Sequence, residues 1–357
     1  MNIGITRKSV IKNILVIHTH GGLGDLLLSI PVFRSLRAEY PQARIDAMVR
    51  ESFVDVISGD PAINSIIPIP SRMDKGFAHF TEQLSLITKG RYDLAIVLWS
   101  QAREAWLLTL AGVPIRVGQD GRLLYSFLFT HRLVRKSDQG DESTHWVENQ
   151  LDFLRILGIE PIDKSVSIYI PEEARQYADN LLKSEGIKDG EFLIGYHTSK
   201  GLPVDSTRWP VEKFAAFGDS LAEKFNAKLV FTGSPSEKKL VDEIRSYTKA
   251  PSISVAGKTN IKQMAAIAKR CNLFVCPDSG PMHIAAAVGT PVVGIYGLKE
   301  DFPKRWAPYN CRHKIVRLEN IPCDLKCVKA DCPRFKCYEA IPEEMVVKAA
   351  EEVLRQG

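Results

Sequence analysis

Short apolar stretches alternate with longer amphipathic ones along most of the chain. In the first half, apolar runs predict strands at NILVIHT, RIDAMV, INSIIPIP and YDLAIVLW. Amphipathic spacing predicts helices at DLLLSIPVFRSLRAEYP, FTEQLSLITKG and STHWVENQLDFLRILG, with Pro31 disturbing the first helix and Pro41 ending it. Strands separated by helices predict a parallel sheet with helices on both faces.

Residues 163–190 interrupt this alternation, because polar, turn-rich edges enclose one expected strand and one amphipathic helix. The alternation then restarts, with strands expected at EFLIGYHT, AKLVFTG, SISVAG, LFVCPDSG and PVVGIYG. Helices are expected between them at VEKFAAFGDSLAEKF, SEKKLVDEIRSY, IKQMAAIAKRC and MHIAAAVG. The pattern predicts two doubly wound α/β domains with the active site in a cleft between them.

We place the domains at 1–172 and 191–357, with a linker region at 173–190 between them. A chain of 357 residues also exceeds the size at which a single core usually stops growing. The last helix, PEEMVVKAAEEVLRQ, is amphipathic and is expected to pack on one of the domains, with packing on the N-terminal domain left open.

Composition adds limits on location and partners. The chain is 45% hydrophobic and 25% charged, which is typical of a soluble globular protein. A net charge of +5 does not suggest nucleic-acid binding, but it suits anionic substrates or an anionic membrane face. No apolar run approaches the ~18 residues of a membrane span, and ILVIH is too short for a signal-peptide core. An odd number of cysteines, seven, fits a reducing compartment, so we expect a cytoplasmic protein.

The stretch HTHGGLGDLLLSIP turns from strand to helix through Gly21, Gly22 and Gly24, and Asp25 follows them. The glycine spacing does not match the dinucleotide fingerprint, which disfavours an NAD-dependent oxidoreductase. No Gly-Lys-Ser/Thr follows, which excludes a P-loop. Asp25 either complements the helix dipole or acts as a general base for a hydroxyl nucleophile. Gly22 and Gly24 would let an acceptor approach the backbone.

The stretch CPDSGPMHIAAAVG repeats this strand–turn–helix arrangement in the second half. The backbone N–H groups that open its helix can hold a phosphate, at Ser279, Gly280, Met282 and His283. Asp278 either caps the turn or binds a hydroxyl, and His283 is either a packed residue or a donor to phosphate.

Two further strand ends carry candidate ligands. HTSKGLPVDSTRWP offers Thr198 and Ser199, with Lys200 and Arg208 as cations for a leaving phosphate or as ordinary surface charges. In TGSPSEKK, Glu237 either binds ribose hydroxyls or caps a helix.

The paired segments GGLGDLLLSIPVFRSLRAEYP and DSGPMHIAAAVGTPVVGIYG resemble glycosyltransferase family 9, the ADP-heptose:lipopolysaccharide heptosyltransferases. AGVPIRVG, RWP and TGSPSE support the resemblance, which extends over nearly the whole chain. It implies the GT-B fold, with two Rossmann-like domains and an interdomain cleft. It also implies inverting, metal-independent transfer of heptose from ADP-heptose to the lipopolysaccharide inner core, with Kdo or heptose as acceptor. No cofactor is expected, and the enzyme would work peripherally at the cytoplasmic face of the inner membrane.

Within that resemblance, Asp25 matches the catalytic base, and Asp278 to His283 match the nucleotide-diphosphate site. Glu237 matches a ribose-binding acid, and Arg72 lies near basic residues used for the acidic acceptor.

Two positions depart from the family pattern. Thr207 stands where the family commonly has a lysine that steadies the leaving phosphate, so either Arg208 or Lys200 takes over or the donor differs. Trp99 stands where relatives can carry an acid. Two alternatives therefore stay open: a family 9 transferase with another nucleotide sugar or acceptor, and a nucleotide-sugar-binding protein without turnover.

Four cysteines lie in the stretch CDLKCVKADCPRFKC, at Cys323, Cys327, Cys332 and Cys337. Their spacing fits neither common zinc sites nor iron–sulfur runs, so we expect reduced loop thiols, with a structural zinc site as the alternative. Residues 311–337 hold seven Lys or Arg against three acids. That excess indicates a solvated loop or a contact with anionic lipid or a phosphorylated acceptor.

Overall fold

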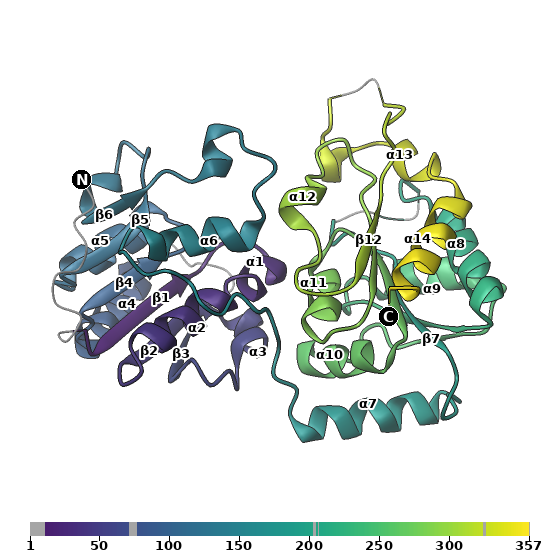
Figure 1. Ribbon diagram of the computed structural model, residues 1–357, viewed down its shortest axis with the longest axis horizontal. Coiled ribbons are helices and arrows are strands. Elements are labelled where there is room, and N and C mark those ends of the chain that lie inside the picture. The colour runs from purple at the N-terminus through teal and green to yellow at the C-terminus, as the bar shows by residue number, and fades with distance from the viewer. Residues whose placement is uncertain (1–10, 71–76, 203–204, 206, 324–325, 357) are drawn as a thin grey trace. The chain divides into compact units, whose positions relative to one another are not determined.

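The chain folds into two compact units, one up to Tyr169 and one from Ile170 onward. The computed structural model describes residues 11–356 apart from 71–76, 203–204, 206 and 324–325. Each unit contains a six-stranded parallel sheet with helices packed on it (Figure 1). Two doubly wound α/β domains, as the alternation of strands and helices predicts, are therefore confirmed.

The first sheet has the strand order β3-β2-β1-β4-β5-β6, and all neighbouring strands are parallel. The order reverses between β1 and β4, so ligands are expected outside the carboxyl ends of these two strands. Strand β1 is a continuous apolar run because both of its faces are covered, and Ile14 to Ile17 are fully buried. The strands are β1 (Asn13–His18), β2 (Arg44–Arg50), β3 (Ser65–Ile69), β4 (Leu94–Val97), β5 (Ile115–Gln119) and β6 (His131–Leu133).

The helix predicted after the first glycine turn is two helices, α1 (Leu23–Leu27) and α2 (Ile30–Glu39). The Ser29 hydroxyl, at the break, donates to the Leu26 carbonyl at 2.7 Å. Pro31 lies in the first turn of α2, where a backbone N–H has no helical partner. The other helices of this unit are η2 (Glu51–Phe53), α3 (Val54–Ile57), α4 (Phe77–Gly90), α5 (Ala102–Leu110), η3 (Ser126–Leu128), η4 (Lys136–Gln139) and α6 (Trp146–Arg155).

The second sheet has the order β12-β11-β10-β7-β8-β9, again with parallel neighbours. Its strands are β7 (Leu193–His197), β8 (Lys228–Thr232), β9 (Ser252–Ser254), β10 (Leu273–Pro277), β11 (Val292–Ile295) and β12 (His313–Val316). Its helices are α7 (Glu172–Ser184), α8 (Val211–Phe225), α9 (Lys238–Tyr247), α10 (Ile261–Arg270), α11 (Gly280–Ala287), α12 (Pro303–Trp306), η5 (Lys329–Asp331), α13 (Lys336–Glu339) and α14 (Glu343–Leu354).

The core of the second unit includes an aromatic group in which Trp209 lies 5.2 Å from Phe214 and 5.0 Å from Tyr338, between ring centroids. Helix α14 buries Val346 and Val353 in the same core and packs on α8, β11 and β12. The last helix, whose packing partner the sequence left open, is thus part of the second unit's core. The predicted linker 173–190 comprises most of α7, which packs on α10.

The strand expected at the start of the 163–190 segment does not form, because residues 163–170 make no sheet pairing. A side chain holds this segment instead. Arg34 on α2 donates to the Ser165 carbonyl at 3.2 Å, to the Ser165 hydroxyl at 2.6 Å and to the Ser167 hydroxyl at 2.6 Å. The same guanidinium pairs with Asp60 at 3.0 Å. The apolar–polar alternation here places Val166, Ile168 and Ile170 in buried positions without forming a strand.

Among the described residues, no helix combines the length and the apolar character that crossing a bilayer requires.

Candidate active site

The turn after β1 places Asp25 against two glycines. Gly21 has a φ of +84°, and a Cβ there would lie 2.9 Å from the Asp25 Cγ. A Cβ at Gly22 would lie 3.3 Å from the Asp25 Oδ2, and the Gly22 amide donates to that oxygen at 2.6 Å. The half-buried Asp25 carboxylate therefore caps the first turn of α1 and occupies space that side chains at Gly21 and Gly22 would fill.

Arg50, the last residue of β2, supports this turn from the neighbouring strand. Its guanidinium donates to the Gly21 carbonyl. Burial lowers the pKa of Arg50, and the negative charge of nearby Asp25 opposes this shift. Sequence analysis missed Arg50, although a cation at the carboxyl end of the strand beside β1 was a usable signal.

A buried carboxylate from α5 completes the polar groups at this sheet edge. Glu104 accepts a hydrogen bond from the Thr19 hydroxyl at 2.6 Å and lies 3.8 Å from His20 Nδ1. Thr19 Oγ1 and His20 Nδ1 are 2.9 Å apart. Because Thr19 follows β1 and Glu104 follows β4, the contact joins the two strands where their order reverses. Sequence analysis missed both residues.

Burial disfavours the charged form of both histidines at this edge. Burial lowers the pKa of His18 from 6.5 to about 4, because its ring is enclosed at the end of β1. Burial also lowers the pKa of His20, and the Glu104 carboxylate opposes that shift. The first unit thus places the Asp25 and Glu104 carboxylates and the Arg50 guanidinium at the same sheet edge as two imidazoles whose pKa values burial lowers.

In the second unit the strand order reverses between β10 and β7, and both predicted nucleotide segments follow these strands. Thr198, Ser199 and Lys200 follow β7, and Asp278 to His283 follow β10. The Lys200 ammonium connects the two segments, because it lies 3.2 Å from both the Asp278 carboxylate and the Asp278 carbonyl. The structure thus brings these predicted residues together at one edge of the sheet.

Lys200 also pairs with a carboxylate that sequence analysis missed, Asp301 at 2.8 Å. Burial lowers the pKa of Lys200, but the Asp278 and Asp301 charges outweigh it, and the pKa is raised. Burial raises the pKa of Asp301, and the Lys200 charge opposes that shift. Lys200 is therefore a charged, positioned residue whose ammonium is already paired.

Glu237, at the start of α9, joins this edge from β8. Its Oε2 accepts from the Ser234 amide at 2.8 Å and from the Ser234 hydroxyl at 2.7 Å. Its Oε1 lies 3.8 Å from His197 Nε2 at the end of β7. Burial raises the pKa of Glu237, but His197, Ser199 and Ser234 outweigh it and the pKa is lowered. The lowered pKa favours the ionised carboxylate, which lies beside the β7 end and makes no side-chain cap hydrogen bond to α9.

The start of α11 presents backbone more than side chains. The Met282 side chain is fully buried, and its sulfur accepts from the Tyr296 hydroxyl at 3.6 Å. His283 is also buried, and Ser279 donates to the Pro277 carbonyl at 3.0 Å. With Gly280 as the first helical residue, this turn can contact an anion mainly through main-chain N–H groups.

Arg208 is directed to a loop of its own unit. Its guanidinium donates to the Ala330 carbonyl at 2.7 Å and to the Cys332 carbonyl at 3.4 Å. The adjacent Trp209 donates from Nε1 to the Thr198 carbonyl at 2.9 Å, while the Thr207 hydroxyl donates to Asp205 at 2.6 Å. The segment therefore anchors both the cysteine-rich loop and the Thr198 backbone.

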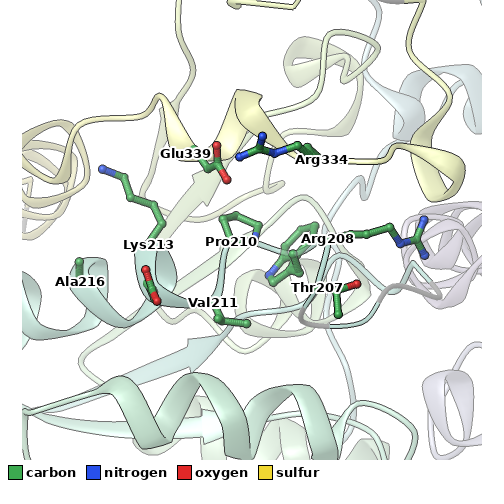
Figure 2. Close-up of a pocket in the computed structure, with 10 residues that line it drawn as sticks. Thr207, Arg208, Pro210, Val211, Lys213, Ala216, Arg334 and Glu339 are labelled. Atoms are coloured by element: carbon green, nitrogen blue, oxygen red, sulfur yellow. The ribbon is translucent and has the colours of Figure 1, made fainter.

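A pocket of about 510 Å³ lies beside this segment. Figure 2 shows Arg208 pointing away from Lys213, and the Arg334 guanidinium directed toward Glu339. Of the predicted site residues, Arg208 alone lines this pocket. Both signs of charge surround it, so the lining does not define an anion site.

The remaining predicted positions have other surroundings. Arg72 lies outside the described residues. Trp99 packs 5.7 Å from Trp146, between ring centroids, and the Arg135 guanidinium lies 5.3 Å from its ring. Gly24 is buried inside α1 and Gly22 is exposed.

All seven cysteines lie in the described part of the chain, and none forms a disulfide. Cys323, Cys327, Cys332 and Cys337 line one small apolar cavity. Within the described residues, no group of three or more His, Cys, Asp or Glu side chains is arranged to hold a metal ion.

Two Rossmann-like units with polar turns at both points of strand-order reversal form the architecture of the GT-B glycosyltransferases. The crystal structure of a glycosyl transferase family 9 protein from Veillonella parvula matches with a TM-score of 0.80 and 26% identity, covering 100% of this chain and 99% of that one. The structure of E. coli ADP-heptose LPS heptosyltransferase II matches with a TM-score of 0.74 and 23% identity, covering 96% and 99%.

Sequence comparison agrees. The family model for glycosyltransferase family 9 (heptosyltransferase) matches residues 84–338. Lipopolysaccharide heptosyltransferase 3 of Escherichia coli (strain K12) is 30% identical over 342 residues, covering 93% of this chain and 95% of that protein. Lipopolysaccharide heptosyltransferase 2 of the same strain is 26% identical, covering 83% and 85%. The chain belongs to glycosyltransferase family 9, and it is a glycosyltransferase whose relatives support heptosyl transfer in lipopolysaccharide core assembly.

Proposed function

We propose that the protein transfers heptose from ADP-heptose to Kdo or heptose of the lipopolysaccharide inner core, with inversion at the anomeric carbon and without a metal ion. A structural relative, E. coli heptosyltransferase WaaC, has been solved with ADP, which supports the donor class. The lipopolysaccharide heptosyltransferases among the sequence relatives support the acceptor class. An acceptor of this kind is anchored in a membrane, so the enzyme would act peripherally at the cytoplasmic face of the inner membrane.

The placement of Asp25 carries the proposal. In the proposed reaction its carboxylate takes the proton of the acceptor hydroxyl, and the oxygen attacks the anomeric carbon of heptose. The bond between that carbon and the diphosphate oxygen breaks on the opposite face, and ADP leaves as an anion. Arg50 fixes the Gly21 carbonyl beside Asp25 and is thus a positioning residue.

The leaving diphosphate would be held at the β7 and β10 ends. The main-chain N–H groups of Gly280 and His283, at the start of α11, would take up its developing charge. Because Lys200 is paired with Asp278 and Asp301, and Arg208 with two loop carbonyls, both cations would position these segments. In this arrangement no cation would replace the lysine that the family commonly has at Thr207; replacement by Arg208 or Lys200, or a different donor, are the alternatives. Glu237 would bind ribose hydroxyls.

The base assignment is tested with Asp25→Asn. The amide oxygen can still accept from the Gly22 N–H, so the turn is kept while the base is lost. We expect kcat to fall by about 10²–10⁴-fold at saturating acceptor. Asp55→Asn, which removes a first-turn carboxylate from α3, is the matched control and should keep kcat. Near-wild-type turnover of Asp25→Asn would overturn the assignment.

Donor and acceptor are tested with a screen of purified enzyme. ADP-heptose is compared with other nucleotide sugars, each with Kdo–lipid A and with heptosylated cores as acceptors. Transfer from ADP-heptose to either acceptor is expected. Transfer from a different donor would indicate another family 9 specificity, and ADP-heptose binding without turnover would indicate a binding protein. Turnover in excess EDTA is expected to equal turnover without it.

A further inference from the structure

The loop between β5 and β6 exposes large apolar side chains to solvent. Leu123 is 98% exposed, Leu124 is 83% exposed and Phe127 is 63% exposed. Scattered exposed apolar residues are normal, but two adjacent leucines and a phenylalanine within five residues form a contiguous apolar feature. We call these three residues the loop tip.

The loop tip is held in place by the protein beneath it. The Tyr125 hydroxyl donates to the Ser100 carbonyl at 2.8 Å, and the Ser126 hydroxyl donates to the Gln119 carbonyl at 2.9 Å. Leu128 and Phe129 are buried in the first unit's core. Anchoring residues thus alternate with exposed ones, so the apolar side chains are presented by a fixed turn.

Helix α5 adds two apolar residues beside this loop. It packs on η3, which contains Phe127 (Figure 1 shows α5 near β5 and β6). Trp106 is 43% exposed and Leu110 is 57% exposed, and their spacing of four residues places them on one helix face. Tryptophan is favoured at the interface between lipid and water, because its ring is apolar and its N–H is polar.

Positive charge lies next to the loop tip. Residues 101–136 contain two carboxylates and six Arg or Lys side chains, of which Arg135 is buried and pairs with Asp138, and Lys136 pairs with Asp152. One of those carboxylates, Glu104, is buried, and the other, Asp120, pairs with Arg132 at 3.7 Å. Arg122 is exposed and directly precedes the two leucines. Apolar side chains next to exposed cations are complementary to a bilayer with anionic headgroups.

We propose that the loop tip, with Trp106 and Leu110, inserts into the headgroup region of an anionic bilayer. A protein partner would need a matching hollow for a tip that projects almost wholly into solvent, whereas lipid closes around such a shape. The inference rests on the membrane-anchored acceptor of the proposed function, and it locates the membrane contact in the first unit. It differs from a contact through the basic residues of 311–337.

The test is flotation of the full-length protein with vesicles of phosphatidylglycerol and phosphatidylethanolamine, without donor or acceptor. Leu123→Ser/Leu124→Ser is expected to lower the vesicle partition coefficient by about tenfold or more. Arg122→Gln should weaken binding to anionic vesicles several-fold. Ile162→Ser, an 85% exposed aliphatic residue near the segment held by Arg34, is the matched control and should bind as wild type.

Unchanged binding of the double variant would overturn the proposal, as would loss of binding only after Lys326→Gln/Lys336→Gln in the cysteine-rich segment. A change of oligomeric state in light scattering, with vesicle binding unchanged, would show instead that a second copy covers the loop tip. Unfolding midpoints confirm that each variant is folded. Because no sugar transfer is measured, a failure here leaves the proposed reaction untouched, and a failed donor screen leaves the vesicle result interpretable.

Discussion

At the scale of single residues, Lys200 shows how a buried charge is kept in place. Its ammonium is nearly enclosed and lies between two carboxylates, one of them on the segment after β10 and the other just beyond β11. A buried ion pair is weak evidence for net stability, but removing one partner leaves an uncompensated buried charge. Lys200 is therefore expected to matter first for the fold of this edge.

Lys200→Met is expected to lower the free energy of unfolding by about 3–5 kcal/mol, because Asp278 and Asp301 then face each other without a cation. Urea unfolding at pH 7 measures this. The double variant Lys200→Met/Asp301→Leu should recover part of the loss, since one uncompensated carboxylate is removed. Equal losses in the single and double variants would show that charge pairing is not the cause.

His18 predicts a specific dependence of stability on pH. The pKa of His18 is about 4 in the folded protein and 6.5 for an ordinary, solvent-exposed histidine, as in the unfolded chain. As the pH falls, the unfolded chain therefore protonates this ring before the folded protein does. The contribution of His18 to stability is thus complete above pH 6.5 and is lost progressively down to pH 4. The difference corresponds to roughly 3 kcal/mol.

His18→Leu should therefore lose less stability than wild type between pH 7 and pH 4.5, as measured by urea unfolding at both pH values. His79→Leu, on α4 in the same unit, is the control and should follow the wild-type dependence. A wild-type pH dependence in His18→Leu would contradict the assignment of the shift to this buried ring.

At the scale of elements, the apolar runs predicted the central strands well, because β1, β4, β7 and β10 are buried on both faces. The pattern did not identify β5, which lies inside the first sheet, or the edge strands β6 and β12. These three strands are three to five residues long and include half-exposed positions, so they lack a continuous apolar run. The strand predicted at 163–170 is wrong for the opposite reason. The residues alternate as in a strand, but the segment is held by hydrogen bonds from Arg34 and not by a neighbouring strand.

Some residues of the candidate site could be predicted from the sequence, and others could not. Segments that follow predicted strands, around Asp25, Lys200 and Asp278, could be located because the carboxyl ends of parallel strands share one edge. Glu104 and Asp301 could not be located from the sequence, since a helix or loop whose position depends on tertiary packing brings each carboxylate to the sheet edge. No local motif marks either carboxylate.

The glycine turn of α1 gives a prediction at this scale. Gly21 and Gly112 both have positive φ, +84° and +72°, but only at Gly21 would a Cβ meet another residue, the Asp25 side chain. Both Gly21→Ala and Gly112→Ala should lose about 1–3 kcal/mol of stability from backbone strain. Only Gly21→Ala should also lose transfer activity, by about tenfold or more, because the carboxylate is displaced.

The two variants are compared by thermal unfolding and by kcat at saturating acceptor. Because they share the backbone effect, the ratio of their activities isolates the contact with Asp25. Equal activities would show that the position of this carboxylate does not depend on Gly21.

At the scale of the whole molecule, each unit has its own sheet and core, and the boundary lies between Tyr169 and Ile170. Helix α7 is held to the second unit by its buried Ala178 and Leu182 and by the Tyr177 hydroxyl, which donates to the Lys258 carbonyl at 2.6 Å. Asp179 also pairs with Arg270 at 3.1 Å. These contacts make α7 a structural part of the second unit, although its sequence is polar and follows a break in the pattern.

This division predicts that residues 170–357 fold alone. The fragment should unfold cooperatively in urea, because the core around Trp209, Phe214 and α14 lies wholly within it. The fragment 191–357, which lacks α7 and uncovers α10, is the matched comparison and should be less stable by about 3 kcal/mol.

If the proposed donor site is correct, calorimetry should detect ADP binding to the longer fragment while transfer is absent, since Asp25 lies in the other unit. A longer fragment without a cooperative transition would mean that the second unit needs the first to fold, whereas a folded fragment that does not bind ADP would count against a donor site formed by the β7 and β10 ends alone.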